Sequence, residues 1–171
     1  MTTDQFLTHI KRKLPVKGRL KIVEFFFAFS RFECALKATS NFRSVNHNKV
    51  EANWNVFVNT IQNRFDRTRT EELEEAVTYI INHPPRIQAI DAHDNLSWRA
   101  RVFQPHDNLT TKLKCHICDI RNNLFHGGKF YGSYEEDVSR NYILLDKSII
   151  ILNEWLNLSD AVRENFLEPI N

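Results

Sequence analysis

Residues that break regular structure are scarce in this chain of 171 residues, which has four glycines and five prolines. A β-sandwich or β-barrel needs such residues at its many turns, so their scarcity argues against both folds. Thirteen phenylalanines and long periodic apolar runs indicate helices instead. We expect residues 1–171 to form a single all-α domain, a helical bundle of four to five main helices with short terminal helices.

Other absences bear on the compartment and the partners. Residues 1–6 lack the basic and then apolar order of a signal peptide, and no apolar run approaches the length of a membrane span. Three cysteines, an odd number, do not indicate a disulfide framework. We therefore expect a cytoplasmic protein without membrane contact. The net charge of +2 is too small to indicate a class of partner.

Apolar spacing, caps and breakers locate the expected helices, and Pro15 and Gly18 are the breakers between the first two. They cover about residues 3–12, 20–38, 50–65, 71–81, 108–126, 133–156 and 159–166. A capping box over 68–71 opens the fourth, and Asp107 or Asn108 caps the fifth. The helix over 20–38 is apolar around much of its circumference, which predicts a central helix or one shared with a dimer interface. Residues 40–48 and 86–104 are expected to be loops, the second with at most a short extended piece.

One stretch combines residue types suited to chemistry, and it reads Arg121-Asn122-Asn123-Leu124-Phe125-His126-Gly127-Gly128-Lys129. The glycine pair predicts that the helix ends there, so His126 should lie in its last turn or at its C-cap. Asn122 is one turn before His126 on the same face, whereas Arg121 lies about 140° around the axis. Arginine and histidine converge more easily if two copies face each other, so we expect a homodimer with the site at its interface. A long arginine side chain curling back within one protomer is the alternative.

Glu33 falls on the apolar face of the helix over 20–38, where an unpaired carboxylate is costly to bury. A local ion pair with Lys37, one turn later, would satisfy it. Alternatively, Glu33 meets Arg121 or His126 and orients that side chain.

The spacing Arg-x4-His over Arg121 and His126, with a polar residue after the arginine, resembles the signature of the HEPN superfamily (higher eukaryotes and prokaryotes nucleotide-binding). Residues 29–37 are also similar to stretches of bacterial HEPN-like proteins. The resemblance spans about residues 20–157, and its specificity rests on residues 121–129. It implies a helical bundle with the motif near the end of a late helix, and a usually dimeric, metal-independent endoribonuclease.

Residue chemistry agrees with that implication. Cleavage of RNA by its own 2′-hydroxyl, which gives a 2′,3′-cyclic phosphate, needs proton transfer and a cation on the phosphate. His126 can transfer protons and Arg121 can bind phosphate oxygens in a bidentate way. Asn122 can position the histidine or donate to the phosphate. We expect supporting or substrate-binding roles for the residues around them, Glu33, Lys37, Asn123 and Lys129, and no metal or other cofactor.

The expected partners are RNA and, because HEPN domains commonly serve in toxin–antitoxin, antiphage or stress-response systems, an antitoxin or defence-system protein. One departure weakens the antitoxin expectation. HEPN toxins paired with nucleotidyltransferase antitoxins carry a tyrosine two residues after the histidine, where this chain has Gly128, and the nearest tyrosine is Tyr131.

Plainer interpretations stay open. Some HEPN-like domains are modules that only bind RNA, a nucleotide or a protein, and such a module is the alternative to a nuclease, although the intact Arg-x4-His favours cleavage. Arg121 could merely pair with Asp119 or Glu33 while His126 caps its helix. Cys115 and Cys118 flank His116 in a pattern that invites zinc, but no second ligand pair has matching spacing, and cysteines three apart in a helix are more often core residues.

Overall fold

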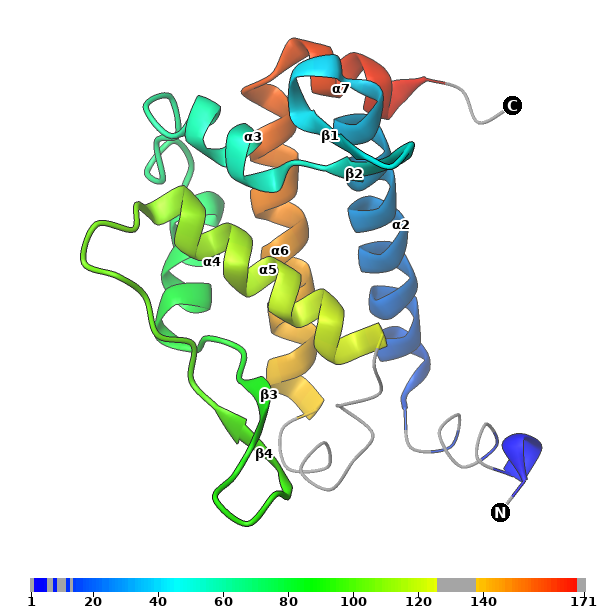
Figure 1. Ribbon diagram of the computed structural model, residues 1–171. Helices are drawn as coiled ribbons and strands as arrows, with labels where there is room; N and C mark the ends of the chain where they lie inside the picture. The colour runs from blue at the N-terminus through cyan, green and yellow to red at the C-terminus, as the bar shows by residue number, and fades with distance from the viewer. Residues whose placement is uncertain (1, 6–7, 9–11, 13, 126–137, 169–171) are drawn as a thin grey trace.

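The computed structural model describes residues 2–5, 8, 12, 14–125 and 138–168, and in these ranges the chain is mostly helical (Figure 1). Its elements are α2 (Val16–Ala38), the 3-10 turn η1 (Ser40–Phe42), β1 (Arg43–Asn46), β2 (Lys49–Ala52), α3 (Trp54–Ile61), α4 (Glu71–Asn82), β3 (Ile87–Ile90), β4 (Leu96–Arg99), α5 (Leu109–Phe125), α6 (Val138–Asn157) and α7 (Asp160–Leu167). No helix within these ranges is both long and apolar enough to cross a membrane.

Two small antiparallel sheets make the all-α prediction too strict, because β1 pairs with β2 and β3 with β4. The expected loops over 40–48 and 86–104 are largely these hairpins, and α3 begins at Trp54 rather than at residue 50. The first hairpin turns at His47 and Asn48, which both have positive φ. Such a turn is usually marked by Asn-Gly, so His-Asn gave little signal. In the second, the Asp91 carboxylate accepts from the backbone N–H groups of His93 and Asn95.

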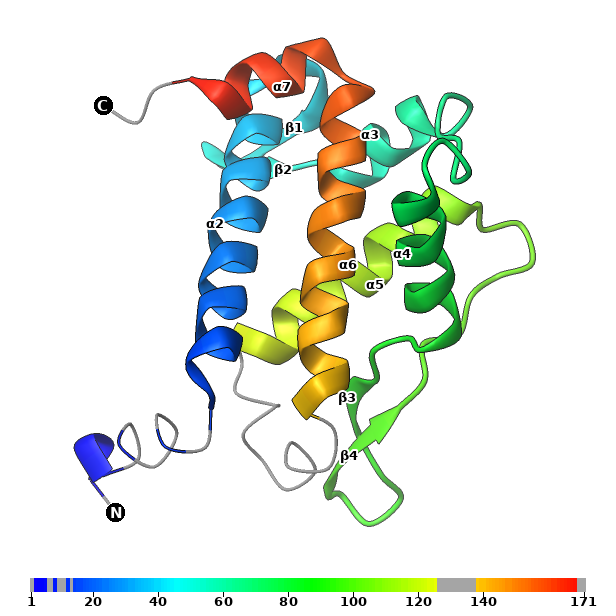
Figure 2. The same cartoon turned by 180° about the vertical axis from the view of Figure 1, so that it is seen from behind.

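The core lies between α2 and α6, which run side by side in both views (Figures 1 and 2). α7 packs across one end of this pair, α4 packs against α6, and α5 crosses the bundle obliquely. Aromatic rings join the helices. Phe32 of α2 stacks on Trp54 with 5.2 Å between ring centroids, and Phe57 meets Trp155 of α6 edge-on at 6.2 Å. The phenylalanine-rich α2 packs one face against this core and leaves other apolar side chains exposed, among them Leu20 and Phe27. It therefore lies beside α6 at the edge of the bundle (Figures 1 and 2), and the prediction of a central helix was too strict.

α2 begins four residues earlier than predicted, because Gly18 does not break it. A Cβ at this position would lie about 2.0 Å from the Tyr142 ring of α6. The glycine thus allows a close approach of the two helices, and the expected break at Gly18 was wrong. Of the short helix expected over 3–12, residues 3–5 are helical and much of the remainder lies outside the described residues.

The caps match expectation at one helix and differ at another. The Asn108 side chain accepts from the backbone N–H of Thr111 at 2.8 Å, as predicted for the start of α5. At α4 the cap is Thr70, whose hydroxyl accepts from the Leu73 N–H at 3.1 Å, while Thr68 bonds to Asp66. The capping box that used Thr68 was therefore wrong by two residues. The expected start of the last long helix at residue 133 lies outside the described residues.

Candidate functional site

Arg121 lies in the last turn but one of α5 and is fixed by three contacts from its surroundings. Its Nη1 donates to Oδ1 of Asn122 at 2.9 Å, and its Nη2 approaches Oε1 of Glu33 at 3.4 Å. The guanidinium carbon is 5.2 Å from the ring centroid of Phe29, so the cation lies over an aromatic face. The side chain is 32% exposed. Arg121 is thus oriented by the protein and still accessible to a ligand.

Glu33 connects α2, α3 and α5. The same carboxylate oxygen that meets Arg121 accepts a hydrogen bond from Nε1 of Trp54 at 3.1 Å. Trp54 in turn stacks on Phe29 at 5.4 Å, so the carboxylate and the guanidinium share one aromatic support. This arrangement satisfies the half-buried carboxylate. Of the three partners considered for Glu33, the structure shows Arg121 rather than Lys37, and His126 lies outside the described residues.

Lys37 does not form the local ion pair with Glu33. It is exposed near the end of α2 and lies closer to the first hairpin. There Glu51 of β2 has a lowered pKa, mainly because Lys49 donates a hydrogen bond to it and attracts its charge, with a smaller contribution from Lys37. The structure thus does not bring Lys37 to Arg121.

The two asparagines that follow Arg121 point to different surroundings. Asn122 is exposed and bonded to Arg121, which keeps it available for a ligand. Asn123 is buried, and its Nδ2 donates to the backbone carbonyl of Arg86 at 2.7 Å. This bond attaches α5 to the segment that leads into β3. Asn123, expected to support substrate binding, therefore has its amide nitrogen engaged in a contact within the fold.

Asp119, the other carboxylate considered for Arg121, belongs to a different ion pair. Arg101 donates to both of its oxygens, from Nε and from Nη2, each at 2.6 Å. Asp119 is 3% exposed, so this bidentate pair is a largely buried tie between α5 and the segment after β4. Neither Arg101 nor its pairing was anticipated, because nothing in the spacing of residues 101 and 119 marks them as neighbours.

Next to this ion pair, His116 is buried with its ring edge-on to Phe103 at 5.1 Å between centroids. Its Nδ1 has no hydrogen-bond partner within the described residues. Burial lowers the pKa of His116 to about 4, an effect that Asp119 opposes and the Arg101 charge reinforces. His116 is therefore a neutral core residue at physiological pH.

The buried His116 should make the fold sensitive to acid. An unfolded histidine binds its proton near pH 6.5, whereas the folded one resists protonation until about pH 4. Stability is therefore lost as the pH falls through this window, and we expect a loss of about 2 to 3 kcal/mol between pH 7 and pH 4. Urea unfolding of the wild type and of His116→Phe, at several pH values, checks this. The phenylalanine keeps the contact with Phe103, so equal pH dependence in both proteins would contradict the expectation.

Cys115 and Cys118, the two cysteines near His116, pack within the fold and are poorly suited to bind a metal ion. Burial raises the pKa of Cys118 to about 12, which disfavours the thiolate that binds metals or acts as a nucleophile. Cys115 is partly buried one turn earlier. Within the described ranges, no group of three or more histidine, cysteine or acidic side chains is placed to hold a metal ion.

His126 and Lys129 lie outside the described residues, as do Gly127 and Gly128. Of the predicted site, the structure therefore brings together Arg121, Asn122 and Glu33, and it adds Phe29 and Trp54, which were not expected to be site residues. Comparison of the chain with models of protein families, with curated proteins and with solved structures finds no match.

Proposed function

We propose that this protein is a metal-independent endoribonuclease of the HEPN type that works as a homodimer. The observation that carries the proposal is the fixed yet accessible guanidinium of Arg121, five residues before His126. A purely structural arginine would be expected to use its donors within the fold. Here two N–H groups are engaged by Asn122 and Glu33, and the other donors of the planar fork can bind a phosphate.

The proposed reaction uses the 2′-hydroxyl of the RNA as nucleophile. A histidine takes the proton from this hydroxyl, the oxygen attacks the adjacent phosphorus, and the bond to the 5′-oxygen of the next nucleotide breaks. A second group, acting as proton donor, protonates the departing oxygen, which leaves a 2′,3′-cyclic phosphate and a 5′-hydroxyl. His126 from the two copies would supply base and acid, while Arg121 stabilises the charge on the phosphate.

The surroundings of Arg121 suit this role. Phe29 supports the flat face of the guanidinium, and Glu33 and Asn122 fix its rotation, so its direction is set before RNA arrives. We assign Glu33 a positioning role. Its 3.4 Å contact is long for an ion-paired hydrogen bond, so Glu33 competes only weakly with a phosphate for the guanidinium. Lys129 would guide the phosphate, and the biological setting would be a toxin–antitoxin, antiphage or stress-response system.

The same geometry favours one alternative, a non-catalytic HEPN module that binds RNA, a nucleotide or a protein partner. In that case Arg121 would exchange Glu33 for an anionic group of its ligand without any cleavage. The contact with Glu33 supports this candidate because a carboxylate already occupies the place of an anion. The two functions differ in whether RNA is cut.

Cleavage of a mixed RNA pool by purified protein in excess EDTA tests the proposal. We expect fragments that end in a cyclic phosphate, and a loss of at least about 100-fold in rate for Arg121→Ala and for His126→Ala. Arg64→Ala and His106→Ala are matched controls, because both side chains are exposed elsewhere, and they should cleave like the wild type. Intact RNA with the wild type, or equal rates in all variants, would overturn the nuclease. RNA binding without cleavage would favour the binding module.

A further inference from the structure

α2 carries a second apolar face that points away from the core. Val16, Leu20, Val23 and Phe27 are 63%, 57%, 47% and 63% exposed. Their spacings are four, three and four residues, which is the seam of a coiled coil rather than a random scatter of surface residues. Contiguous exposed apolar surface of this kind marks an interaction site in a soluble protein.

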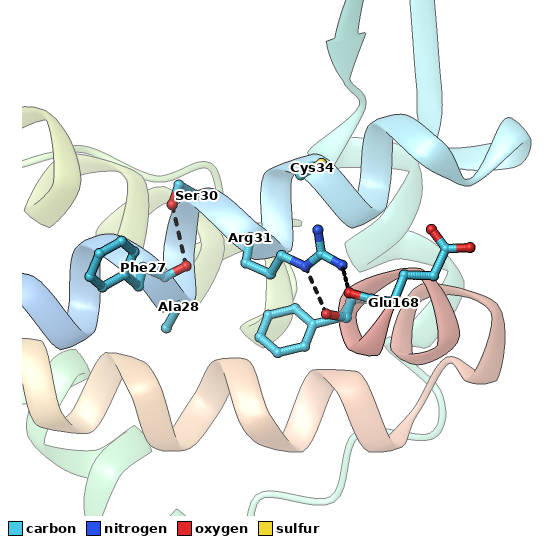
Figure 3. A pocket seen from close by; sticks show the side chains of 7 residues that line it. Phe27, Ala28, Ser30, Arg31, Cys34 and Glu168 are labelled. Carbon is cyan, nitrogen blue, oxygen red and sulfur yellow. Dashed lines mark hydrogen bonds between the residues drawn. The ribbon is translucent and has the colours of Figure 1, made fainter. Parts of the chain in front are cut away.

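The open part of this seam ends near Phe27, where α7 flanks the helix. Arg31 donates to the backbone carbonyls of three residues at the end of α7, at 2.5 to 3.0 Å, and so ties the two helices together. A cavity of about 520 Å³ lies at this junction, and its lining includes Phe27 of α2 and Phe166 of α7. Figure 3 shows Phe27, Arg31 and Glu168 around it. A helix packed on the seam would therefore contact residues 16–27 and end at this cavity.

Charges beside the seam indicate what packs there. Lys17 follows Val16 and Glu24 follows Val23, so both lie on the same flank of the seam, one heptad apart, with opposite charge. Both are exposed, and neither forms an ion pair with another described residue. When two such helices run in opposite directions, the cation on the flank of each lies beside the anion on the flank of the other. The flank therefore fits a second copy of the same helix.

We propose that two copies of this chain pair antiparallel through α2 about a two-fold axis. In this register Leu20 packs against Val23 of the second copy and Val16 against its Phe27. Lys17 of each copy then lies beside Glu24 of the other, which gives two equivalent ion pairs. Sliding one helix by a heptad would place Glu24 beside Glu24 and Lys17 beside Arg31, so like charges oppose the alternative register.

This inference names the surface of the dimer and so deepens the proposed function, but it rests on α2 alone. The seam is short compared with the interface of a typical stable dimer, so we expect a dissociation constant in the micromolar range. A dimer that does not cut RNA would leave the pairing intact and overturn the nuclease. A Leu20→Asp variant that stays dimeric and cuts RNA would overturn the pairing through α2 and leave the nuclease.

Sedimentation equilibrium over about 1 to 200 µM, with circular dichroism to check the fold, tests the pairing. Leu20→Asp should raise the dissociation constant at least about 100-fold, because it places a carboxylate in the seam. Val102→Asp, at an exposed apolar residue outside α2, should leave it unchanged. A monomeric wild type, or Leu20→Asp with wild-type affinity, would overturn the proposal.

A charge exchange tests the register. Lys17→Glu and Glu24→Lys should each weaken the dimer, since either one creates two pairs of like charges, whereas the double variant should restore it. In a parallel pairing Lys17 of one copy would not face Glu24 of the other. The second substitution would then not compensate for the first, and the double variant would stay as weak as Glu24→Lys. Failure of the double variant to recover would therefore overturn the antiparallel arrangement.

Discussion

Arg121→Lys is expected to lower kcat/KM for RNA cleavage about 100-fold while leaving the fold intact. Lysine keeps the positive charge, but it loses the flat surface that lies over Phe29 and the fork that reaches Asn122 and Glu33 together. The remaining ammonium is a mobile point charge that can no longer bind two phosphate oxygens at once. Because the arginine is partly exposed, the free energy of unfolding should change by less than about 1 kcal/mol.

Initial rates on one defined RNA, measured beside thermal unfolding, check this expectation. Arg64→Lys is the control, since Arg64 is exposed after α3 and away from the described site. A rate within a few-fold of the wild type for Arg121→Lys would mean that only charge matters at this position. The orienting contacts of Phe29, Asn122 and Glu33 would then have no part in catalysis.

Arg101→Met should lower the free energy of unfolding by about 3 kcal/mol, the largest effect on stability that we expect from a single substitution of a charged residue here. The change leaves the carboxylate of Asp119, which is 3% exposed, without the two 2.6 Å bonds that satisfy it. A buried charge that loses its partner typically costs 3 to 5 kcal/mol, and partial exposure of Arg101 places our value at the lower end. Urea unfolding measures the difference.

The double variant Arg101→Met with Asp119→Leu separates the cost of an unpaired charge from the value of the pair. Because apolar side chains replace both partners, we expect most of the lost stability to return. If the double variant is as unstable as the single one, the pair itself stabilises the fold. A single variant within about 1 kcal/mol of the wild type would mean that water or another group satisfies Asp119.

The sequence predicted those elements whose signals are local. The periodicity of α2 and the Asn108 cap of α5 depend on residues within a few positions of each other. It missed both hairpins, because their turns use left-handed His47, Asn48 and Asp94 in place of glycine. The break predicted at Gly18 was wrong for a related reason. The role of this glycine is to accommodate Tyr142, which is distant in the sequence, and a local pattern reads any such glycine as a breaker.

The same distinction between local and long-range signals applies to the candidate site. That Arg121 and Asn122 are accessible could be expected from their place near a helix end. That Glu33 meets Arg121 rather than Lys37 could be stated only as an alternative, because it depends on how α2 crosses α5. Helical spacing could not show that the indole N–H of Trp54 bonds to Glu33, because the two residues are 21 positions apart. Asn123 and Asp119 lie close in the sequence to Arg121 and Asn122 and have side chains that suit a site. Long-range contacts nevertheless engage them, because Asn123 bonds to Arg86 and Asp119 to Arg101.

The packing of α2 against α6 and α7 also determines when this protein can fold during synthesis. The buried face of α2, with Phe25, Phe29 and Phe32, leaves the ribosome early and is followed soon by Trp54, but α6 and α7, the helices that pack most extensively against α2, come from residues 138–167. At the usual speed of translation, roughly 6 to 25 s pass before α6 and α7 have been synthesised and can cover the aromatic face. Nascent chains should therefore depend on chaperones that bind aromatic segments, and a ribosome stalled before α6 should carry a chain without a native core.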